Sequence, residues 1–333
     1  MAGRELAVGI LGAGYFGACH ARAIIDSPGL RLAAICDCDL EQARRLAAAC
    51  GGASYAHWRQ LLAEAAIDVV VIATPHHLHL PMAVAAANAG KHLLLEKPMG
   101  RTAAECTAII EAAERNRVQL MIGQLLHFAL PCLVARDLLE RGELGRPILG
   151  ASTLSKLWLE ANRRPWHLQT ASGGGMLMTA GIHALDLLVW SMGACVATVY
   201  AAAGALQHAQ AADDSAMLLV RFRDGRFGQV SSIGYRDGGV SYGMELVCEQ
   251  ASLRLDFEAG VAIGRAGRWQ PVANSAEPDW MQQALVREWQ AMLAAVRGEA
   301  AVPVSGAYGR HLIACIEAAL QSNRERREVT VAH

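Results

Sequence analysis

Three glycines near the N-terminus have the spacing of a loop that binds a dinucleotide. Gly12, Gly14 and Gly17 follow the pattern G-x-G-x-x-G. They lie between an apolar run over 6–11, which predicts a buried strand, and a predicted helix over 18–25. In this setting Gly12 permits a tight turn, Gly14 lets the backbone approach a pyrophosphate, and Gly17 lets the helix pack against the strand. The free N–H groups at the helix start would bind the phosphates.

An acidic residue follows at the position expected for a ribose contact. Asp37 comes twenty residues after Gly17, at the end of a second apolar run over 30–36. Its carboxylate is placed to accept hydrogen bonds from the adenosine ribose and would repel a 2′-phosphate, so NAD is favoured over NADP. No arginine follows it, since the next residue is Cys38. The alternative is that Asp37 only caps a helix over 40–50.

A lysine at the end of a predicted strand is the first candidate for catalysis. Lys97 follows the strand-like run 91–95, and an ammonium there is costly unless it has a partner. Glu96 does not neutralise it directly, because neighbouring side chains on a strand point to opposite faces. Pro98 fixes the backbone, and a cis peptide there would aim the ammonium into a crevice. The alternative is a solvated lysine before a loop.

A cluster of polar residues follows another strand, over 68–73. Pro75, directly after Thr74, stops this strand and prepares a helix start. We expect His76 and His79 to border the cofactor. A metal site is the alternative, but the loop offers no cysteine or acid, so no metal is predicted.

These residues need a fold that brings them to one edge. Strands and helices alternate through the first part of the chain, which predicts a doubly wound parallel sheet of the Rossmann type. Ligands of such sheets bind beyond the carboxyl ends of the strands. The residues expected to line one crevice with the glycine loop are Thr74, Glu96, Lys97 and Gln124.

The remainder of the chain has a different pattern. From about residue 196, short strands alternate with turns, which predicts a large, mostly antiparallel open sheet flanked by helices. His183 stands near the start of a predicted helix, where a side chain can project into a cleft, although a lone histidine on an apolar helix is often structural. We therefore predict an NAD-binding Rossmann domain over 1–123 and an α+β domain for substrate binding and oligomerisation over 124–333.

Composition narrows the class of protein. The chain has 333 residues, of which 53% are hydrophobic and 18% charged, so a large core is expected. A net charge of −1 argues against nucleic-acid binding. Nine cysteines without a C-x-x-C pair indicate reduced thiols in the cytoplasm. No signal peptide and no uninterrupted apolar run of about 18 residues is seen, so no membrane contact is predicted.

The motifs together resemble those of the Gfo/Idh/MocA oxidoreductases, a family that includes glucose–fructose oxidoreductase and inositol 2-dehydrogenase. The resemblance runs along essentially the full chain. Its first half consists of the glycine motif from Gly12, T-P-x-x-x-H over 74–79 and E-K-P over 96–98. The family's second pattern, G-G-G-x-L-x-D-x-G-x-H-x-x-D-x-x-x-W, matches at Gly173, Gly174, Gly175, Leu177, Gly181, His183, Asp186 and Trp190.

The resemblance implies roles for particular residues. Lys97 and His183 would handle the proton of the substrate, and the open sheet of the second domain would pack against a partner subunit in a homodimer or homotetramer. The chain departs from the pattern at Thr179, where many members carry an aspartate, and at Gln124, where an asparagine is common.

The departure at Thr179 bears on the substrate, because a missing carboxylate favours an anionic ligand. Lys156, Arg163 and Arg164 could meet a substrate carboxylate, or they could form a solvated basic loop. Apolar surface for a cyclic substrate, or ordinary core, would come from Trp158, Trp166, Met176 and Met178.

The predicted function is an NAD-dependent oxidoreductase that transfers a hydride between nicotinamide and a secondary alcohol or ketone of a sugar, polyol, sugar acid or cyclic diol. His183 would act as general base and Lys97 would stabilise the negative oxygen, or the reverse. The alternatives are a lyase, hydrolase or epimerase that recycles NAD, and a non-catalytic NAD-binding sensor. The predicted cofactor-binding residues are Gly12, Gly14, Tyr15, Phe16, Gly17, Asp37, Cys38, Thr74, Pro75, His76, His79, Glu96, Lys97 and Gln124. The predicted substrate-binding residues are Lys97, Lys156, Arg163, Trp166, Thr179 and His183.

Overall fold

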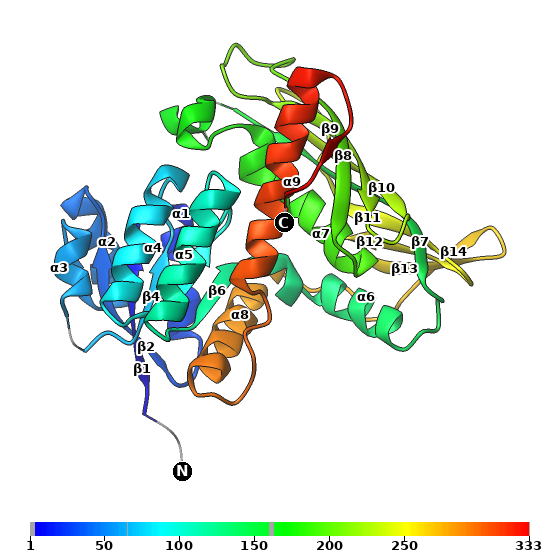
Figure 1. Cartoon of the computed structure of the whole chain (residues 1–333). Helices are drawn as coiled ribbons and strands as arrows, with labels where there is room; N and C mark the ends of the chain where they lie inside the picture. Colours follow the sequence, from blue (N-terminus) through cyan, green and yellow to red (C-terminus); the bar gives the residue numbers. More distant parts are fainter. Residues whose placement is uncertain (1–3, 65, 160–162, 333) are drawn as a thin grey trace. The chain divides into compact units, whose positions relative to one another are not determined.

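The chain folds into two compact units, shown in a computed structural model that describes residues 4–64, 66–159 and 163–332 (Figure 1). The first unit comprises Met1–Phe128 and Met281–Arg310, and the second comprises Ala129–Trp280 and His311–His333. The chain therefore passes between the units at three points. The sequence-based division at 123/124 had assigned the segment Met281–Arg310 to the second domain.

The first unit is built on a six-stranded sheet in the order β3-β2-β1-β4-β5-β6, and every neighbouring pair is parallel. This is the strand order of the doubly wound dinucleotide-binding fold, as predicted. β1 and β4 are buried along their whole length, because helices cover both faces of the sheet. The strands are β1 (Leu6–Leu11), β2 (Leu30–Cys36), β3 (Ala53–Tyr55), β4 (Val69–Ile72), β5 (His92–Glu96) and β6 (Leu120–Gly123).

The helices of this unit connect the strands, and one helix returns from the far end of the sequence. The connecting helices are α1 (Tyr15–Ile25), α2 (Leu40–Cys50), α3 (Trp58–Leu62), η1 (His76–Leu78), α4 (His79–Asn88) and α5 (Ala103–Arg115), and η2 (Leu125–Phe128) follows β6. The returning helix is α8 (Trp280–Val296), whose Trp289 is fully buried. Its indole Nε1–H donates to His20 on α1, which ties α8 into the core of the first unit.

The second unit contains a nine-stranded sheet in the order β14-β13-β12-β11-β7-β10-β9-β8-β15. The neighbours β7 and β10 are parallel and the other pairs are antiparallel, which confirms a mostly antiparallel sheet. The strands are β7 (Pro147–Leu157), β8 (Val196–Gly204), β9 (Ser215–Phe222), β10 (Phe227–Tyr235), β11 (Ser241–Cys248), β12 (Ser252–Asp256), β13 (Gly260–Arg265), β14 (Arg268–Pro271) and β15 (Val329–Thr330).

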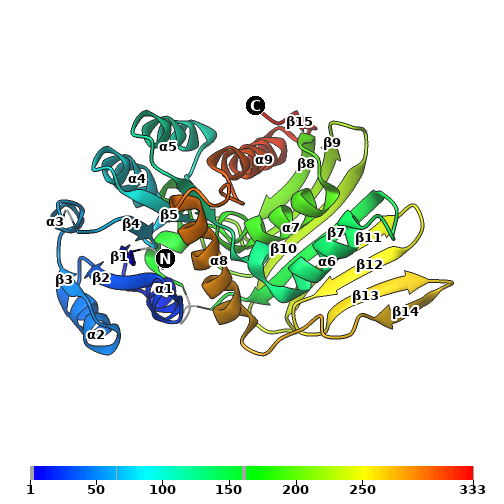
Figure 2. The ribbon, with the colours of Figure 1, turned by 90° about the horizontal axis from the view of Figure 1, so that it is seen from below.

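Helices cover one face of this sheet. The helical segments are α6 (Leu130–Glu140), η4 (Pro165–Leu168), η5 (Thr170–Ser172), η6 (Leu177–Gly181), α7 (Ile182–Met192) and α9 (Gly306–Glu325), which begins in the first unit. α7 packs on β7, β10 and β11, and α6 packs on β12 and β13 (Figure 2). Gly150 on β7 makes the approach of α7 possible, because a Cβ there would lie 2.5 Å from a methyl of Leu188.

Side-chain alternation divides the two faces of the sheet. On β9, residues alternate between buried and exposed, as expected where one face is covered and the other is open. The open face carries exposed apolar side chains from adjacent strands: Leu149, Tyr200, Met217, Leu219, Phe227 and Val247.

One helical stretch of the described chain, Thr170–Met192, is long and apolar enough to cross a membrane, with a mean hydropathy of 1.3. However, 89% of that window is buried inside the protein. It is the core helix of the second unit.

Candidate functional site

The glycine loop of the first unit joins β1 to α1. Gly12 has a φ of +101°, and a Cβ there would lie 2.4 Å from the carbonyl oxygen of Ala73. A Cβ on Gly17 would lie 1.9 Å from the carbonyl oxygen of Gly12, so the helix could not approach the strand. The steric roles predicted for these two glycines are confirmed.

Gly14 differs from the other two glycines because it faces open space. A Cβ there would meet nothing within 4 Å. Gly14 is the N-cap residue of α1. Because glycine has no side chain, it offers no side-chain hydrogen bond to the first N–H groups of the helix. An exposed backbone at a helix N-terminus fits the pyrophosphate of a dinucleotide.

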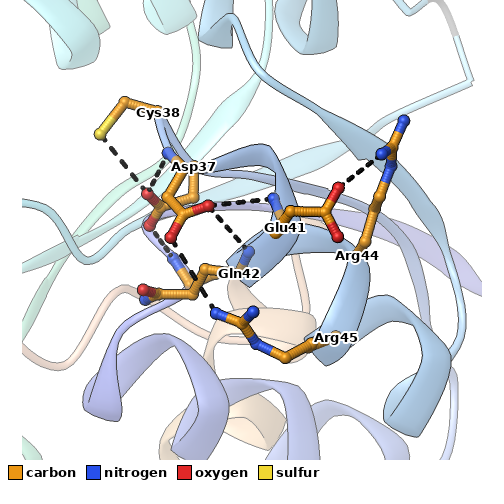
Figure 3. A network of polar contacts seen from close by, with 8 residues as sticks. Asp37, Cys38, Glu41, Gln42, Arg44 and Arg45 are labelled. Carbon is orange, nitrogen blue, oxygen red and sulfur yellow. Dashed lines mark hydrogen bonds and ion pairs between the residues drawn. The ribbon is translucent and has the colours of Figure 1, made fainter.

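Asp37 is tied to this loop by a hydrogen bond. Its Oδ2 accepts the Ala13 N–H at 2.8 Å and its Oδ1 accepts the Asp39 N–H at 3.0 Å (Figure 3). The cap of α2 is Asp39, which accepts the N–H groups of Glu41 and Gln42. The alternative that Asp37 only caps this helix is therefore wrong. Its carboxylate lies beside the glycine loop, where a ribose contact was predicted.

The thiols beside Asp37 are protonated at neutral pH. Burial, followed by the charge of Asp37, raises the pKa of Cys36 to about 12. The same two causes raise the pKa of Cys38, whose side chain is exposed and whose Sγ lies 3.5 Å from Asp37 Oδ1. Cys38 thus adds no charge next to Asp37.

Lys97 follows β5, and its ammonium approaches the glycine loop. Its Nζ lies 5.8 Å from the ring centroid of Phe16, within the range of a cation–π contact. The Lys97–Pro98 peptide is cis. Glu96 is buried, and its Oε1 lies 2.9 Å from His20 Nε2. The two neighbouring side chains therefore have different surroundings, as predicted, and Lys97 shares a site with the glycine loop.

His79 is fully buried behind the ends of two strands. Its Nδ1 lies 2.8 Å from the carbonyl oxygen of Pro98 and its Nε2 lies 2.9 Å from that of Thr74. Burial lowers the pKa of His79, so the ring is neutral and donates to one of the two carbonyls. The ring of His76, also buried, packs edge-on at 5.7 Å. His79 supports the loop after Thr74 and directs both nitrogens at main-chain atoms.

The strand register sets the edge at which these residues meet. Leu11 pairs with Ile72, Ile72 with Leu95, and Glu96 with Gly123, so the strands end at the same edge of the sheet. Gln124 follows β6 at this edge and is 1% exposed. Its N–H donates to the Ile122 carbonyl, and its Oε1 accepts no hydrogen bond from the described residues.

Three buried polar residues of the first unit were missed by the sequence analysis. His20, Glu288 and Trp289 are each 0% exposed, and all three surround Glu96 or its partner. Two sequence features could have pointed to these residues: a glutamate within the apolar stripe of the helix 280–296, and a histidine three residues after Gly17. Polar residues at core positions need a partner, and none could be assigned from local spacing.

In the second unit, His183 lies in the first turn of α7. The preceding segment, Leu177–Gly181, is a π-helical turn, a feature frequent at functional sites. His183 is 8% exposed, and its ring centroid lies 6.3 Å from that of Tyr242. Gly181 allows the close approach of this turn to β10, since a Cβ would lie 2.3 Å from Ser232 Oγ. Thr179 lies within the π turn, which directly precedes the helix that carries His183.

A partly buried carboxyl group, also missed, lies where this helical segment begins. Asp213 Oδ2 accepts the Leu177 N–H at 2.7 Å. Gly175, with a φ of +102°, leaves room for it, because a Cβ there would lie 2.3 Å from Oδ1. Burial raises the pKa of Asp213 to about 6. A carboxyl at the N-terminus of a helix is favourably placed for the helix dipole.

Lys156 lies on the face of the sheet that α7 covers. It stands on β7 between Leu154 and Trp158, which are 4% and 2% exposed and share its face. Its strand partner is Gly234, which brings no side chain. Burial lowers the pKa of Lys156, and among the described residues no carboxylate forms an ion pair with it.

The two arginines in the loop after β7, Arg163 and Arg164, have different surroundings. Arg163 donates to Gln210 Oε1 at 2.5 Å, and its guanidinium carbon lies 5.9 Å from the Trp158 ring. The alternative of a fully solvated loop is therefore wrong for Arg163, whereas Arg164 is exposed. Trp166 stacks on His167 at 3.7 Å. The start of the predicted loop, residues 160–162, lies outside the described residues.

No metal centre is found in the part of the chain that the structure describes. No group of three or more histidine, cysteine, aspartate or glutamate side chains there could hold an ion. The three histidines after Pro75 diverge, because His77 is exposed while His76 and His79 are buried.

These features define a Rossmann-type dinucleotide-binding unit joined to an α+β unit with an open sheet. Residues 6–124 match the NAD-binding Rossmann fold of an oxidoreductase family, GFO/IDH/MocA, and residues 132–254 match the C-terminal domain of the same family. The chain belongs to the GFO/IDH/MocA family, and it is an NAD-binding oxidoreductase.

Several known proteins are similar to this chain over most or part of its length. Inositol 2-dehydrogenase 1 from Saccharopolyspora erythraea is 29% identical over 97% of this chain and 96% of its own. A 1-carboxy-3-chloro-3,4-dihydroxycyclohexa-1,5-diene dehydrogenase from Comamonas testosteroni is 32% identical over 51% of this chain and 43% of its own. The structure of a levoglucosan dehydrogenase in complex with NADH and L-sorbose superposes with a TM-score of 0.90 at 23% identity, covering 98% and 99% of the two chains.

Proposed function

We propose that this protein oxidises a secondary alcohol of a polyol, sugar or cyclic diol with NAD. Bound NAD supplies the acceptor for the hydrogen and electrons that leave the carbinol carbon. The open backbone at Gly14 and the start of α1 would hold the pyrophosphate, and Asp37 would hold the adenosine ribose. The family match and the named relatives support this reaction class.

Within this proposal, Lys97 and His183 handle the proton of the substrate hydroxyl. His183 accepts the proton as general base, and Lys97 donates a hydrogen bond to the oxygen and stabilises its negative charge. The observation that carries the proposal is the ammonium of Lys97 lying 5.8 Å from the Phe16 ring, directly at the cofactor loop. A cation beside an oxidised nicotinamide would have a lowered proton affinity, which suits exchange of a proton.

We further propose that the substrate carries a carboxylate on a ring. Lys156 supports this, because its half-buried ammonium lacks a carboxylate partner among the described residues. Thr179 supports it as well, since it brings a hydroxyl where many family members have a negative charge. The Comamonas relative is named for a carboxylated cyclic diol, which is the same chemical class.

A second copy of this chain would cover the open face of the nine-stranded sheet, in a homodimer or homotetramer. The apolar side chains exposed there, such as Met217 at 56% and Leu219 at 50%, support this arrangement. The nine free cysteines support a reducing, cytoplasmic location. The burial of Thr170–Met192 inside the protein supports a function that does not involve insertion into a membrane.

The experiment that tests the reaction is a screen of neutral and carboxylated polyols, sugars and cyclic diols with NAD, followed by NADH absorbance. Lys97→Ala should lower turnover on the order of 10²-fold while melting temperature and NAD affinity stay close to wild type. Turnover equal to wild type would exclude the catalytic role of Lys97. Product formation without NADH, from protein purified with NAD bound, would instead indicate the NAD-recycling class.

A further inference from the structure

Behind Lys97, on the buried side of β5, lies a chain of polar contacts that the proposed reaction does not use. Trp289 on α8 donates its Nε1–H to His20 Nδ1 at 3.1 Å. His20 on α1 lies with its Nε2 2.9 Å from Glu96 Oε1. Glu96 Oε2 accepts the main-chain N–H of Lys97 at 3.2 Å. A chain of polar contacts from α8 through α1 to β5 thus ends at the main-chain N–H of Lys97, the candidate catalytic lysine.

The protons in this chain can be assigned from donor and acceptor chemistry alone. An indole N–H can only donate, so His20 Nδ1 must be the acceptor and carries no proton. The ring proton therefore sits on Nε2 and is donated to Glu96. Since both Glu96 oxygens accept hydrogen bonds, Glu96 is the carboxylate. Trp289 thus fixes His20 as a neutral donor.

A second buried acid, Glu288, lies next to this carboxylate but outside the chain of hydrogen bonds. It is 0% exposed, and neither of its carboxyl oxygens bonds to a described residue. Burial, followed by the charge of Glu96, raises the pKa of Glu288 well above its ordinary value. Two adjacent buried carboxyls cannot both be charged at little cost, so Glu288 holds the proton and Glu96 the charge.

We propose that Trp289, acting through His20 and Glu96, is a positioning residue for Lys97. The indole N–H sets the tautomer of His20, the His20 Nε2–H orients the Glu96 carboxylate, and that carboxylate holds the Lys97 main chain at the end of β5. Because His20 lies on α1, the same contacts join the helix at the cofactor loop to the lysine. This inference rests on the proposed role of Lys97.

The first experiment compares two isosteric changes at neighbouring acids. Glu96→Gln replaces an oxygen that accepts a hydrogen bond with an NH₂ group, so either the His20 Nε2–H or the Lys97 N–H loses its acceptor. The kcat should then fall on the order of 10²-fold, with a KM for NAD within about threefold of wild type. Glu288→Gln replaces one neutral group with another, so kcat should stay within about twofold of wild type. Equal losses in both variants, or none in Glu96→Gln, would overturn the inference.

The second experiment observes the ring of His20 in the intact protein by ¹⁵N NMR, with its signals identified by their loss in His20→Gln. In the wild type at pH 7, the Nδ1 signal should be that of an unprotonated nitrogen and the Nε2 signal that of a protonated one. Trp289→Phe keeps an aromatic ring but removes the indole donor, so the Nδ1 signal of His20 should change and kcat should fall while the KM for NAD stays near that of wild type. A wild-type His20 that carries its proton on Nδ1, or a Trp289→Phe variant whose Nδ1 signal and kcat both match wild type, contradicts the inference.

Four other ionisable groups surround this cluster. They are Glu288 from α8, Cys19 from α1, His79 from α4, and Lys97 beyond Glu96.

The variants distinguish failure of the proposed role of Lys97 from failure of the positioning role. If Lys97→Ala retains full turnover, the proposed catalytic role of Lys97 fails, whereas a loss in Lys97→Ala with no loss in Glu96→Gln removes only the positioning role.

Discussion

The main-chain N–H of Ala13 and the carboxylate of Asp37 are joined by a hydrogen bond of 2.8 Å. This contact fixes the end of β2 against the glycine loop, so the carboxylate proposed to contact the adenosine ribose is held by the loop proposed to bind the phosphates. A carboxylate held in this way cannot turn aside to admit a 2′-phosphate.

The double variant Asp37→Ser with Cys38→Arg should change cofactor preference. It removes the repelling charge and adds a guanidinium partner, so the ratio of the NADP to the NAD dissociation constant should fall by about tenfold or more. Binding is measured by titration calorimetry. Asp37→Asn is the control, because it removes the charge but keeps an acceptor for Ala13. A wild type that binds NADP as tightly as NAD contradicts the role of Asp37.

The substrate proposal predicts a preference for acids. Wild type should favour a uronic acid or a carboxylated cyclic diol over its neutral counterpart in kcat/KM, and both Thr179→Asp and Lys156→Gln should reduce that ratio by about tenfold. The first adds a negative charge and the second removes the cation. Arg164→Gln, at an exposed side chain, is the matched control. Preference for the neutral compound, unchanged by Thr179→Asp, would remove the argument.

Asp213 should make stability depend on pH. Burial raises its pKa from 3.8 to about 6, so in this range the folded state binds more protons than the unfolded state. Its contribution to stability is therefore full below about pH 4 and is lost as the pH rises through about 6, with a total of ~3 kcal/mol. Asp213→Asn keeps an acceptor for Leu177 and cannot ionise. Its melting temperature should exceed that of wild type at pH 8 and approach it at pH 4; parallel curves contradict this.

If a second copy of the chain covers the open face of the nine-stranded sheet, negative charges introduced on that face should disrupt the oligomer. Leu219→Glu with Phe227→Glu places two carboxylates on residues that are 50% and 48% exposed in the single chain. Light scattering should show a shift to monomer with little change in melting temperature. Ile25→Glu on α1, at a side chain that is 54% exposed, serves as the control and should leave the mass unchanged. Retention of the wild-type mass by the double variant would rule out this face.

Local sequence patterns predicted the parts of the site that are built within a few residues. The glycine loop, the acid at the end of β2 and the lysine after β5 each depend on a strand, its last residue and the turn that follows. The steric demand on Gly17 is of this kind, because the atom that would clash is the carbonyl oxygen of Gly12, whereas the clash at Gly12 is with Ala73, just after β4.

Contacts between residues far apart in sequence could not be predicted in this way. His20 meets Glu96 across 76 residues and Trp289 across 269, and no spacing rule joins them. Asp213 is a similar case, since it bonds to Leu177 from a turn 36 residues away. The π turn before His183 was missed because the helical pattern of that segment continues through it.

The late position of α8 in the sequence has a consequence for synthesis. All six strands of the first unit have left the ribosome once residue 123 has emerged, yet Trp289 is made more than 160 residues later. Until then His20 lacks its indole donor, and the surface of α1 that α8 buries faces water. The first unit therefore remains incomplete until most of the second unit has been translated. During that time, chaperones that bind exposed apolar surface can bind to it.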